Sequence, residues 1–163
     1  MQDTKVMKIW DTTLYLRLSR DDGDKEESNS ITGQREFLRD FLSKHPELRE
    51  CAVRVDDGWS GSTFERPDFK KMIEDVKAGR TNCIVVKDLS RFGRNYLDAG
   101  EYIEKIFPFL GVRFIAVNDN YDSLNHSTGD SLVLPVKNFL NDSYSRDISI
   151  KVRSSFESRR QDG

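Results

Sequence analysis

Short strand-like runs alternate with longer amphipathic runs between residues 12 and 117, and this alternation restricts the fold more than any other feature. The strand-like runs are 12–18, 51–56, 83–87 and 112–117, and the helix-like runs are 30–43, 67–79 and 96–109. Strands that alternate with helices pair in parallel, because each helix carries the chain back across the sheet. The run CIVVK at 83–87 is apolar almost throughout, as expected of a strand covered on both faces. We therefore predict an α/β fold with a mostly parallel central sheet flanked by helices.

The last part of the chain carries one long helical pattern instead. Its apolar residues recur at helical spacing: Leu132, Val136, Phe139, Leu140, Tyr144, Ile148, Val152 and Phe156. A helix of about 30 residues spans about 45 Å, which exceeds so small a body. Its distal half therefore either packs on a partner subunit, which we favour, or frays in isolation. Its basic residues, among them Arg146, Lys151 and Arg153, indicate nearby DNA. We predict a catalytic core over 1–128 and, within the same domain, a long projecting helix over 129–163.

Composition argues against several classes of protein. No apolar run approaches the ~20 residues that cross a bilayer, and the N-terminus has no secretory signal, so we expect a cytoplasmic protein without a membrane partner. Cys51 and Cys83 lie in strand-like runs and are expected to be buried free thiols. With only His45 and His126 besides, we expect no metal site and no cofactor. The net charge of −2 argues mildly against nucleic acid, although a local arginine cluster can still hold phosphate.

Candidate chemistry gathers where the strands end, because ligands of open parallel sheets bind beyond the carboxyl ends of the strands. The polar residues that follow the first three strands are Arg17, Ser19, Asp57, Ser60, Arg66, Arg91 and Arg94. Clustered guanidiniums repel one another unless an anion lies between them, and their planar forks suit phosphate oxygens. We therefore predict attack on phosphorus by a serine, with arginines stabilising the charge. No glycine-rich loop ending in Lys-Ser/Thr is present, so ATP and GTP are not indicated.

Four motifs occur in a familiar order: YLRLS (15–19), SITGQREFL (30–38), DDGWSGSTFERPDF (56–69) and VKDLSRFGRN (86–95). Together they resemble the N-terminal catalytic domain of the serine resolvase/invertase superfamily. The full sequences DDGWSGSTFERPDF and KDLSRFGRN, followed by NDSYSRDISIKV, resemble the large serine recombinases of bacterial mobile elements. The resemblance covers about residues 13–163. The resemblance implies a site-specific DNA recombinase of the transposase or integrase type, associated with the nucleoid and acting on DNA and on no small-molecule substrate. Such enzymes form dimers that synapse into tetramers, and they work without metal or ATP.

The resemblance also assigns roles to single residues. Ser19 is the nucleophile that forms a 5′-phosphoserine link, and the phosphate-binding residues are Arg17, Arg66, Arg91 and Arg94. Gln34 and Asp57 complete the catalytic set, and Tyr15 and Ser60 support it. The chain differs from small resolvases at Ser90, where they carry an acidic residue, and Lys77 is only the nearest match to a basic residue of their second long helix. No residue is identified as the general base.

Plainer interpretations of these residues stay open. Ser19, Asp57 and Ser60 are residue types common in turns. Tyr15 is also explained as a strand aromatic, Gln34 as a polar helix position and Arg66 as a solvated helix-start residue. Two other functions compete with recombination: a dimerisation module that has lost activity, and a metal-independent phosphoesterase for small molecules. The large relatives continue into DNA-recognition domains, so we expect a catalytic fragment with weak, nonspecific DNA affinity.

Overall fold

The computed structural model describes residues 6–18 and 30–125. A five-stranded sheet forms its centre, with strands β1 (Trp10–Leu18), β2 (Leu48–Asp57), β3 (Cys83–Val86), β4 (Arg113–Ala116) and β5 (Tyr121–Asp122). The strand order is β2-β1-β3-β4-β5. The first four strands are parallel and β5 runs antiparallel to β4. The mostly parallel sheet confirms the prediction, whereas β5 was not predicted, because a two-residue strand is too short to show a period.

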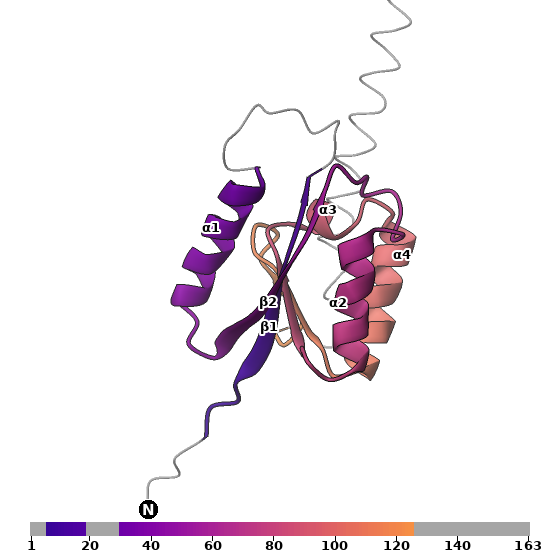
Figure 1. Cartoon of the computed structure of the whole chain (residues 1–163). Coiled ribbons are helices and arrows are strands. Elements are labelled where there is room, and N and C mark those ends of the chain that lie inside the picture. Colours follow the sequence, from indigo (N-terminus) through magenta and orange to yellow (C-terminus); the bar gives the residue numbers. More distant parts are fainter. Residues whose placement is uncertain (1–5, 19–29, 126–163) are drawn as a thin grey trace, which may run out of the picture.

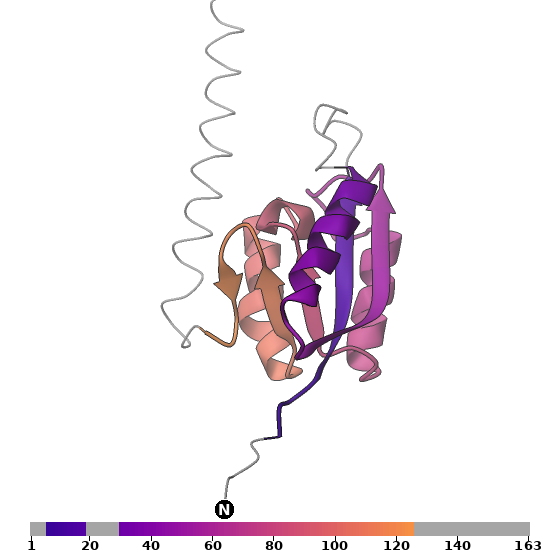
Figure 2. The same ribbon diagram turned by 90° about the vertical axis from the view of Figure 1, so that its left-hand side faces the viewer.

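Helices cover both faces of the sheet (Figures 1 and 2). One face carries α1 (Ile31–Ser43), whose first turn is capped by the Ser30 hydroxyl, an acceptor for the Gly33 N–H at 3.0 Å. The other face carries α2 (Pro67–Lys77) and a segment made of α4 (Tyr96–Glu101), η2 (Tyr102–Ile106) and α5 (Phe107–Phe109). The single turn α3 (Leu89–Phe92) follows β3 at the upper end of Figure 1. The predicted helix over 129–163 lies outside the described residues.

The sheet separates two hydrophobic cores, because neighbouring side chains of a strand point to opposite faces. Leu14 and Leu16 of β1 pack into the core beneath α1. Tyr15 lies between them in sequence and packs into the opposite core, with α2 and η2. That second core is rich in aromatic rings, which meet mostly edge-on or tilted. Arg17 has the same strand parity as Tyr15, so its side chain also belongs to the α2 face.

The segment 96–109, predicted as one α-helix, is interrupted by a π-helical turn. The N–H of Phe107 bonds to the carbonyl of Tyr102, five residues earlier. Pro108 lacks the N–H that a regular α-helix would use at that position, and the wider turn directly precedes it. Ala99, Ile103 and Phe107 are nevertheless buried, so the interrupted segment still turns one apolar face toward the sheet.

The prediction of two buried thiols is half wrong. Both cysteines are free, but only Cys83 is buried, and Cys51 is exposed. Strand order explains the difference: β3 lies between β1 and β4, whereas β2 forms the edge of the sheet and its first half is largely uncovered. Between residues 6 and 125, leaving out 19–29, no helix is long and apolar enough to cross a bilayer.

Candidate active site at the carboxyl ends of the strands

Arg17 joins three chain segments at the end of the sheet where β1 terminates. Its side chain is fully buried. Nε donates to the Arg91 carbonyl at 3.2 Å, Nη1 to the Trp59 carbonyl at 3.0 Å and Nη2 to the Ser90 carbonyl at 2.7 Å. One guanidinium therefore ties β1 to the loop after β2 and to α3.

Gln34 holds the main chain of Arg17 from the other face. Its Nε2 donates to the Arg17 carbonyl at 3.1 Å, and its Oε1 accepts from the Arg17 N–H at 3.4 Å. Nη1 of Arg91 donates to the same carbonyl at 3.2 Å. Because Gln34 is completely buried, it is not merely a solvated polar position on α1. Gln34 fixes the main chain near the end of β1, two residues before the predicted nucleophile.

Arg66 is the second fully buried arginine. Its Nε donates to the Thr63 carbonyl at 2.8 Å, Nη1 to the Tyr15 hydroxyl at 2.7 Å and Nη2 to the Phe92 carbonyl at 2.5 Å. The guanidinium carbon lies 4.9 Å from the ring centre of Phe64, within cation–π distance. Burial lowers the pKa of Arg66 below its usual value. Arg66 is therefore a core residue with an ordered guanidinium, and the interpretation as a solvated helix start is excluded.

Asp56 completes this buried network and was missed by the sequence analysis, which selected Asp57. The Tyr15 hydroxyl donates to Asp56 Oδ2 at 2.7 Å. Burial and the Asp56 carboxylate raise the pKa of Tyr15 above its usual value, against the opposing effect of Arg66. Asp56 is buried whereas its neighbour Asp57 is exposed, because successive strand residues face opposite ways. The alternation along β2 was the available signal, but it does not show which parity faces the site.

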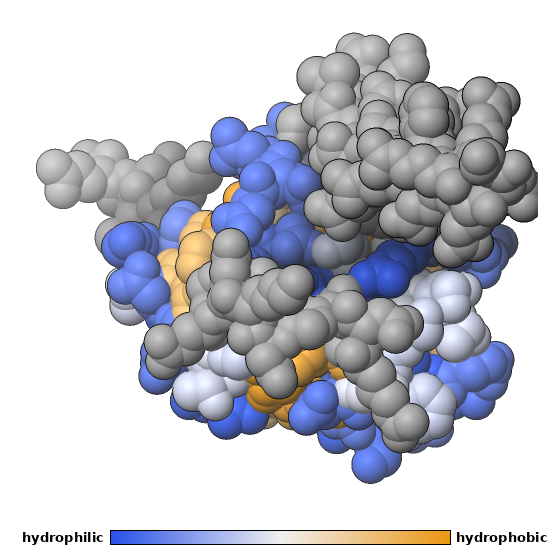
Figure 3. All heavy atoms as spheres, turned by 90° about the horizontal axis from the view of Figure 1, so that it is seen from above, coloured by the Kyte–Doolittle hydropathy of each residue, from blue (hydrophilic) through white to orange (hydrophobic). Residues whose placement is uncertain are grey.

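The remaining predicted residues lie closer to the surface at the same end. Arg91 is mostly buried, whereas Arg94 and Ser60 are exposed. The main-chain N–H of Arg94 donates to the Gly61 carbonyl at 2.7 Å, which joins the two motif loops. The Ser60 hydroxyl accepts from the Ser62 N–H at 3.1 Å and so has a turn-stabilising role. Seen from above, the part of this end that is not covered by grey atoms is mainly hydrophilic, with smaller apolar areas (Figure 3).

Ser19, Arg146, Lys151 and Arg153 lie outside the described residues, so their roles stay predictions. The main chain just before Ser19 is held by a hydrogen bond. The Leu18 carbonyl accepts the Gly58 N–H at 2.6 Å, so the loop that follows β2 holds the end of β1.

Main-chain carbonyl oxygens accept hydrogen bonds from two arginines for which the sequence predicted a bound anion. Arg17 and Arg66 find acceptors inside the protein, so their proximity does not by itself require a bound phosphate. Their effect is to hold α3 and the motif loops in one arrangement, with Arg91 and Arg94 at its outer side. These residues lie at the end of the sheet where open parallel sheets bind ligands.

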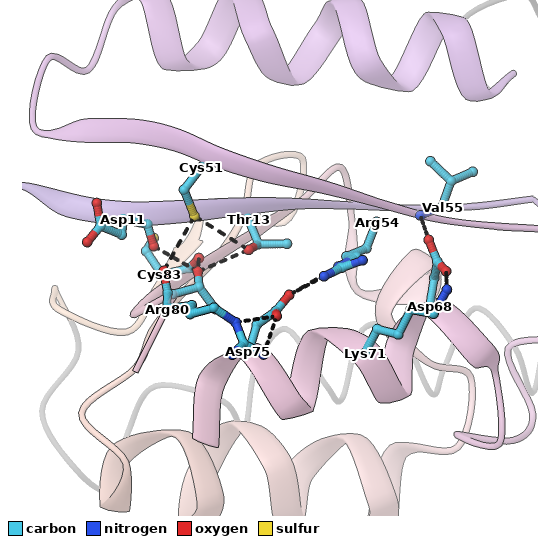
Figure 4. A network of polar contacts seen from close by, with 11 residues as sticks. Asp11, Thr13, Cys51, Arg54, Val55, Asp68, Lys71, Asp75, Arg80 and Cys83 are labelled. Carbon is cyan, nitrogen blue, oxygen red and sulfur yellow. Dashed lines mark hydrogen bonds and ion pairs between the residues drawn. The ribbon is translucent and has the colours of Figure 1, made fainter. Parts of the chain in front are cut away.

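A separate polar cluster lies away from this site, beside the first half of β2 (Figure 4). Asp75 accepts from Arg54 and Arg80, and Cys51 lies near Thr13. These side chains line a cavity of about 220 Å³. In the described part of the chain, no group of three or more His, Cys, Asp or Glu residues is placed to hold a metal ion.

The pattern of one protein family covers almost the whole chain: the family described as "Resolvase, N terminal domain" matches residues 12–163. The chain belongs to this family. It is thus a serine recombinase catalytic domain, and DNA is the partner that family membership implies. The motifs YLRLS, DDGWSGSTFERPDF and VKDLSRFGRN, which carry the resemblance, lie where its strands β1, β2 and β3 end.

Solved structures agree with a resolvase domain. A resolvase family site-specific recombinase from Streptococcus pneumoniae is 27% identical, with a TM-score of 0.59 over 94% of this chain and 99% of that one. The N-terminal catalytic domain of TP901-1 integrase has a TM-score of 0.64 at 21% identity, over 85% of this chain and 98% of that one. The C-terminal catalytic domain of ISC1926 TnpA, an IS607-like serine recombinase, gives 0.54 at 21% identity, over 65% and 68%. The latter two show that the resolvase domain shares their fold.

Proposed function

We propose that this resolvase domain cuts and rejoins DNA with Ser19 as nucleophile, through a 5′-phosphoserine intermediate. The observation that carries the proposal is the buried network of Arg17, Arg66 and Arg91 at the end of β1. It holds the main chain immediately before Ser19 and orders the loop that carries Arg94. A serine delivered beside fixed guanidiniums is equipped for phosphoryl transfer.

In the proposed step, Ser19 Oγ bonds to phosphorus while the bond from phosphorus to the 3′ oxygen breaks. The serine proton leaves to a base, and the 3′ oxygen takes up a proton. Negative charge builds on the non-bridging oxygens, where Arg17, Arg66, Arg91 and Arg94 stabilise it. The phosphoserine ester keeps the bond energy, so a 3′ hydroxyl from another strand reverses the step without ATP. Asp57, Gln34, Tyr15 and Ser60 are proposed to support this arrangement.

The assembly proposal concerns the C-terminal stretch. We propose that residues 129–163 join subunits into a dimer and, in the synapse, a tetramer, while 1–128 form the core. The apolar stripe of 132–156 supports a subunit interface. Arg146, Lys151 and Arg153 contact DNA phosphates, which neutralise their charge. The linked motifs support a large serine recombinase of a mobile element.

Trapping of covalent complexes tests the proposed function. The domain, together with any further sequence that its gene encodes, is produced in cells that carry the DNA flanking that gene, proteins are denatured rapidly, and protein-linked DNA is isolated and sequenced. We expect adducts at defined sites, attached through a 5′ phosphate, and none with Ser19→Ala. Ser43→Ala is the matched control, because Ser43 is an exposed serine on α1 whose hydroxyl bonds only locally.

Two outcomes contradict the proposal. Adducts that persist in Ser19→Ala would move the nucleophile elsewhere. Complete absence of adducts, with recombination unaffected by Ser19→Ala, would favour the non-catalytic dimerisation module.

A further inference from the structure

We propose that Asp56 is a positioning residue for Arg66, which it orients through the Tyr15 hydroxyl and through the N-terminus of α2. The inference rests on the proposed function, because the orientation of Arg66 affects chemistry only if that guanidinium holds the scissile phosphate. Asp56 itself is a buried anion that repels a phosphate, so it acts on the chemistry only by positioning a cation.

The first connection is a two-step hydrogen-bond chain. Arg66 Nη1 donates to the Tyr15 hydroxyl oxygen at 2.7 Å, and that hydroxyl donates to Asp56 Oδ2 at 2.7 Å. A hydroxyl that accepts from a cation and donates to a carboxylate is polarised in one direction, so the two bonds strengthen each other. The position of the Arg66 fork therefore depends on a carboxylate it does not touch.

The second connection is through the helix. Arg66 is the N-cap residue of α2, yet its side chain makes no capping bond. Asp56 takes over that role from β2: its Oδ1 accepts the Asp68 N–H at 3.0 Å and its Oδ2 accepts the Phe69 N–H at 2.9 Å. Because Asp56 caps the helix, the Arg66 side chain is free to turn into the core. One carboxylate thus fixes both the backbone and the guanidinium of Arg66.

Charge supports the same assignment. Burial of the Arg66 guanidinium disfavours its charged form and lowers its pKa, and the nearby Asp56 carboxylate opposes that shift. A buried cation of this kind needs a fixed negative charge at short range. Asp56 supplies it through the Tyr15 hydroxyl, which bonds to both side chains.

The test compares Asp56→Asn, Tyr15→Phe and the double variant in single-turnover cleavage. The probe is a DNA duplex that contains the cleavage site mapped by adduct sequencing. We expect each single variant to slow cleavage about 10- to 100-fold, the scale of a misplaced catalytic group, with DNA affinity nearly unchanged. Both substitutions interrupt one chain, so the double variant should be about as slow as Asp56→Asn alone. Wild-type rates for Asp56→Asn, or losses that multiply in the double variant, would overturn the proposal.

Matched controls separate this effect from loss of stability. Asp75→Asn removes another buried carboxylate, at the opposite end of α2 (Figure 4). Tyr121→Phe removes the hydroxyl of another buried tyrosine, on β5. We expect both to cleave at close to the wild-type rate. Should Asp56→Asn fail to fold, Tyr15→Phe still tests the inference, since it leaves the cap on α2 intact.

A modified substrate gives a readout that a purely structural role does not change. A methylphosphonate at the scissile position replaces one charged non-bridging oxygen by a methyl group, which leaves less charge for Arg66 to stabilise. If Asp56 acts through Arg66, the rate penalty of Asp56→Asn shrinks on this substrate. An equal penalty on both substrates would refute the inference.

The side-chain NMR signal of Arg66 separates failure of this inference from failure of the proposed function. In wild-type protein labelled with ¹⁵N-arginine, we expect the Arg66 Nε–H to be protected from exchange with water. Exchange should become faster in Tyr15→Phe and Asp56→Asn but not in Tyr121→Phe. If no Ser19-dependent adduct forms, the proposed function fails and this measurement alone decides whether Asp56 holds Arg66. Unchanged exchange in both variants would show that it does not.

Discussion

Gly61 lies directly against the guanidinium of Arg17: a Cβ atom at this glycine would be 2.8 Å from Arg17 Nη2. The close approach lets the Trp59 carbonyl, in the loop after β2, accept a hydrogen bond from the same guanidinium. The glycine of this motif is therefore required by contact with an arginine, which gives the sequence pattern a steric cause.

Gly61→Ala should displace Arg17 and slow adduct formation by about 10-fold or more, since the fit here is as demanding as in other catalytic arrangements. Overpacking should also lower the free energy of unfolding by about 1–3 kcal/mol. Denaturant unfolding and single-turnover cleavage measure the two effects. The control is Gly100→Ala in α4, where a Cβ meets nothing within 4 Å, and where alanine should stabilise by about 0.5–1 kcal/mol. Similar behaviour of the two variants would contradict the contact.

Gly93→Ala should destabilise the aromatic core, because its Cβ would overlap the ring of Phe64. That ring cannot move freely, since it packs against Phe69, Phe92 and Tyr102. We expect a loss of about 1–3 kcal/mol in thermal unfolding. A smaller side chain in Phe64→Leu should recover part of this loss in the double variant. Purely additive losses would place the clash elsewhere.

Asp75→Asn should lower stability at neutral pH by about 1–3 kcal/mol, because it removes a charged acceptor from Arg54 and Arg80. Burial alone would raise the pKa of Asp75, but bonds from the two arginines outweigh it and lower the pKa. The stabilisation is therefore complete above the unfolded-state pKa of about 3.9 and is lost as the pH falls through the lower folded-state value.

Urea unfolding of wild-type protein and Asp75→Asn across pH 2–7 checks this sign. The stability difference should be constant at neutral pH and should narrow below about pH 4. Asp40→Asn is the control, because Asp40 forms an exposed pair with Lys44 and should change stability by less than about 1 kcal/mol. If the stability difference between wild-type protein and Asp75→Asn widened in acid, Asp75 would be protonated in the folded protein.

The two cysteines should react with thiol reagents at very different rates. Cys51 is exposed, whereas burial raises the pKa of Cys83 to about 12, and the thiolate is the reactive form. A chromogenic disulfide should therefore label one thiol per folded chain rapidly and the second only after unfolding. Cys51→Ser should abolish the rapid phase and Cys83→Ser should leave it unchanged. Rapid labelling that survives Cys51→Ser would contradict the burial of Cys83.

Sequence periodicity predicted the order of the main strands and helices because each is long enough to show its buried face. It missed α3 and β5, since a single turn and a two-residue strand show no period. It misjudged Cys51 because exposure of β2 depends on which strand forms the edge of the sheet, and strand order is a property of the assembled fold.

The candidate site was predicted in outline for a similar reason. Parallel strand ends bring Arg17, Arg66 and Arg91 together whatever their detailed contacts, and the structure joins them by hydrogen bonds. Their acceptors were not predictable, because every residue carries a carbonyl and only the folded loops decide which one is near. Which of Asp56 and Asp57 enters the buried network likewise depends on which face of the sheet each side chain of β2 points to.

The use of main-chain oxygens by Arg17 and Arg66 has an evolutionary consequence. Their carbonyl acceptors at Trp59, Thr63, Ser90 and Phe92 persist when the side chains there are exchanged. The exposed Trp59, for example, is free to diverge while its carbonyl still holds Arg17. Recombinases built in this way can adapt the surface that meets DNA without rebuilding the frame behind it.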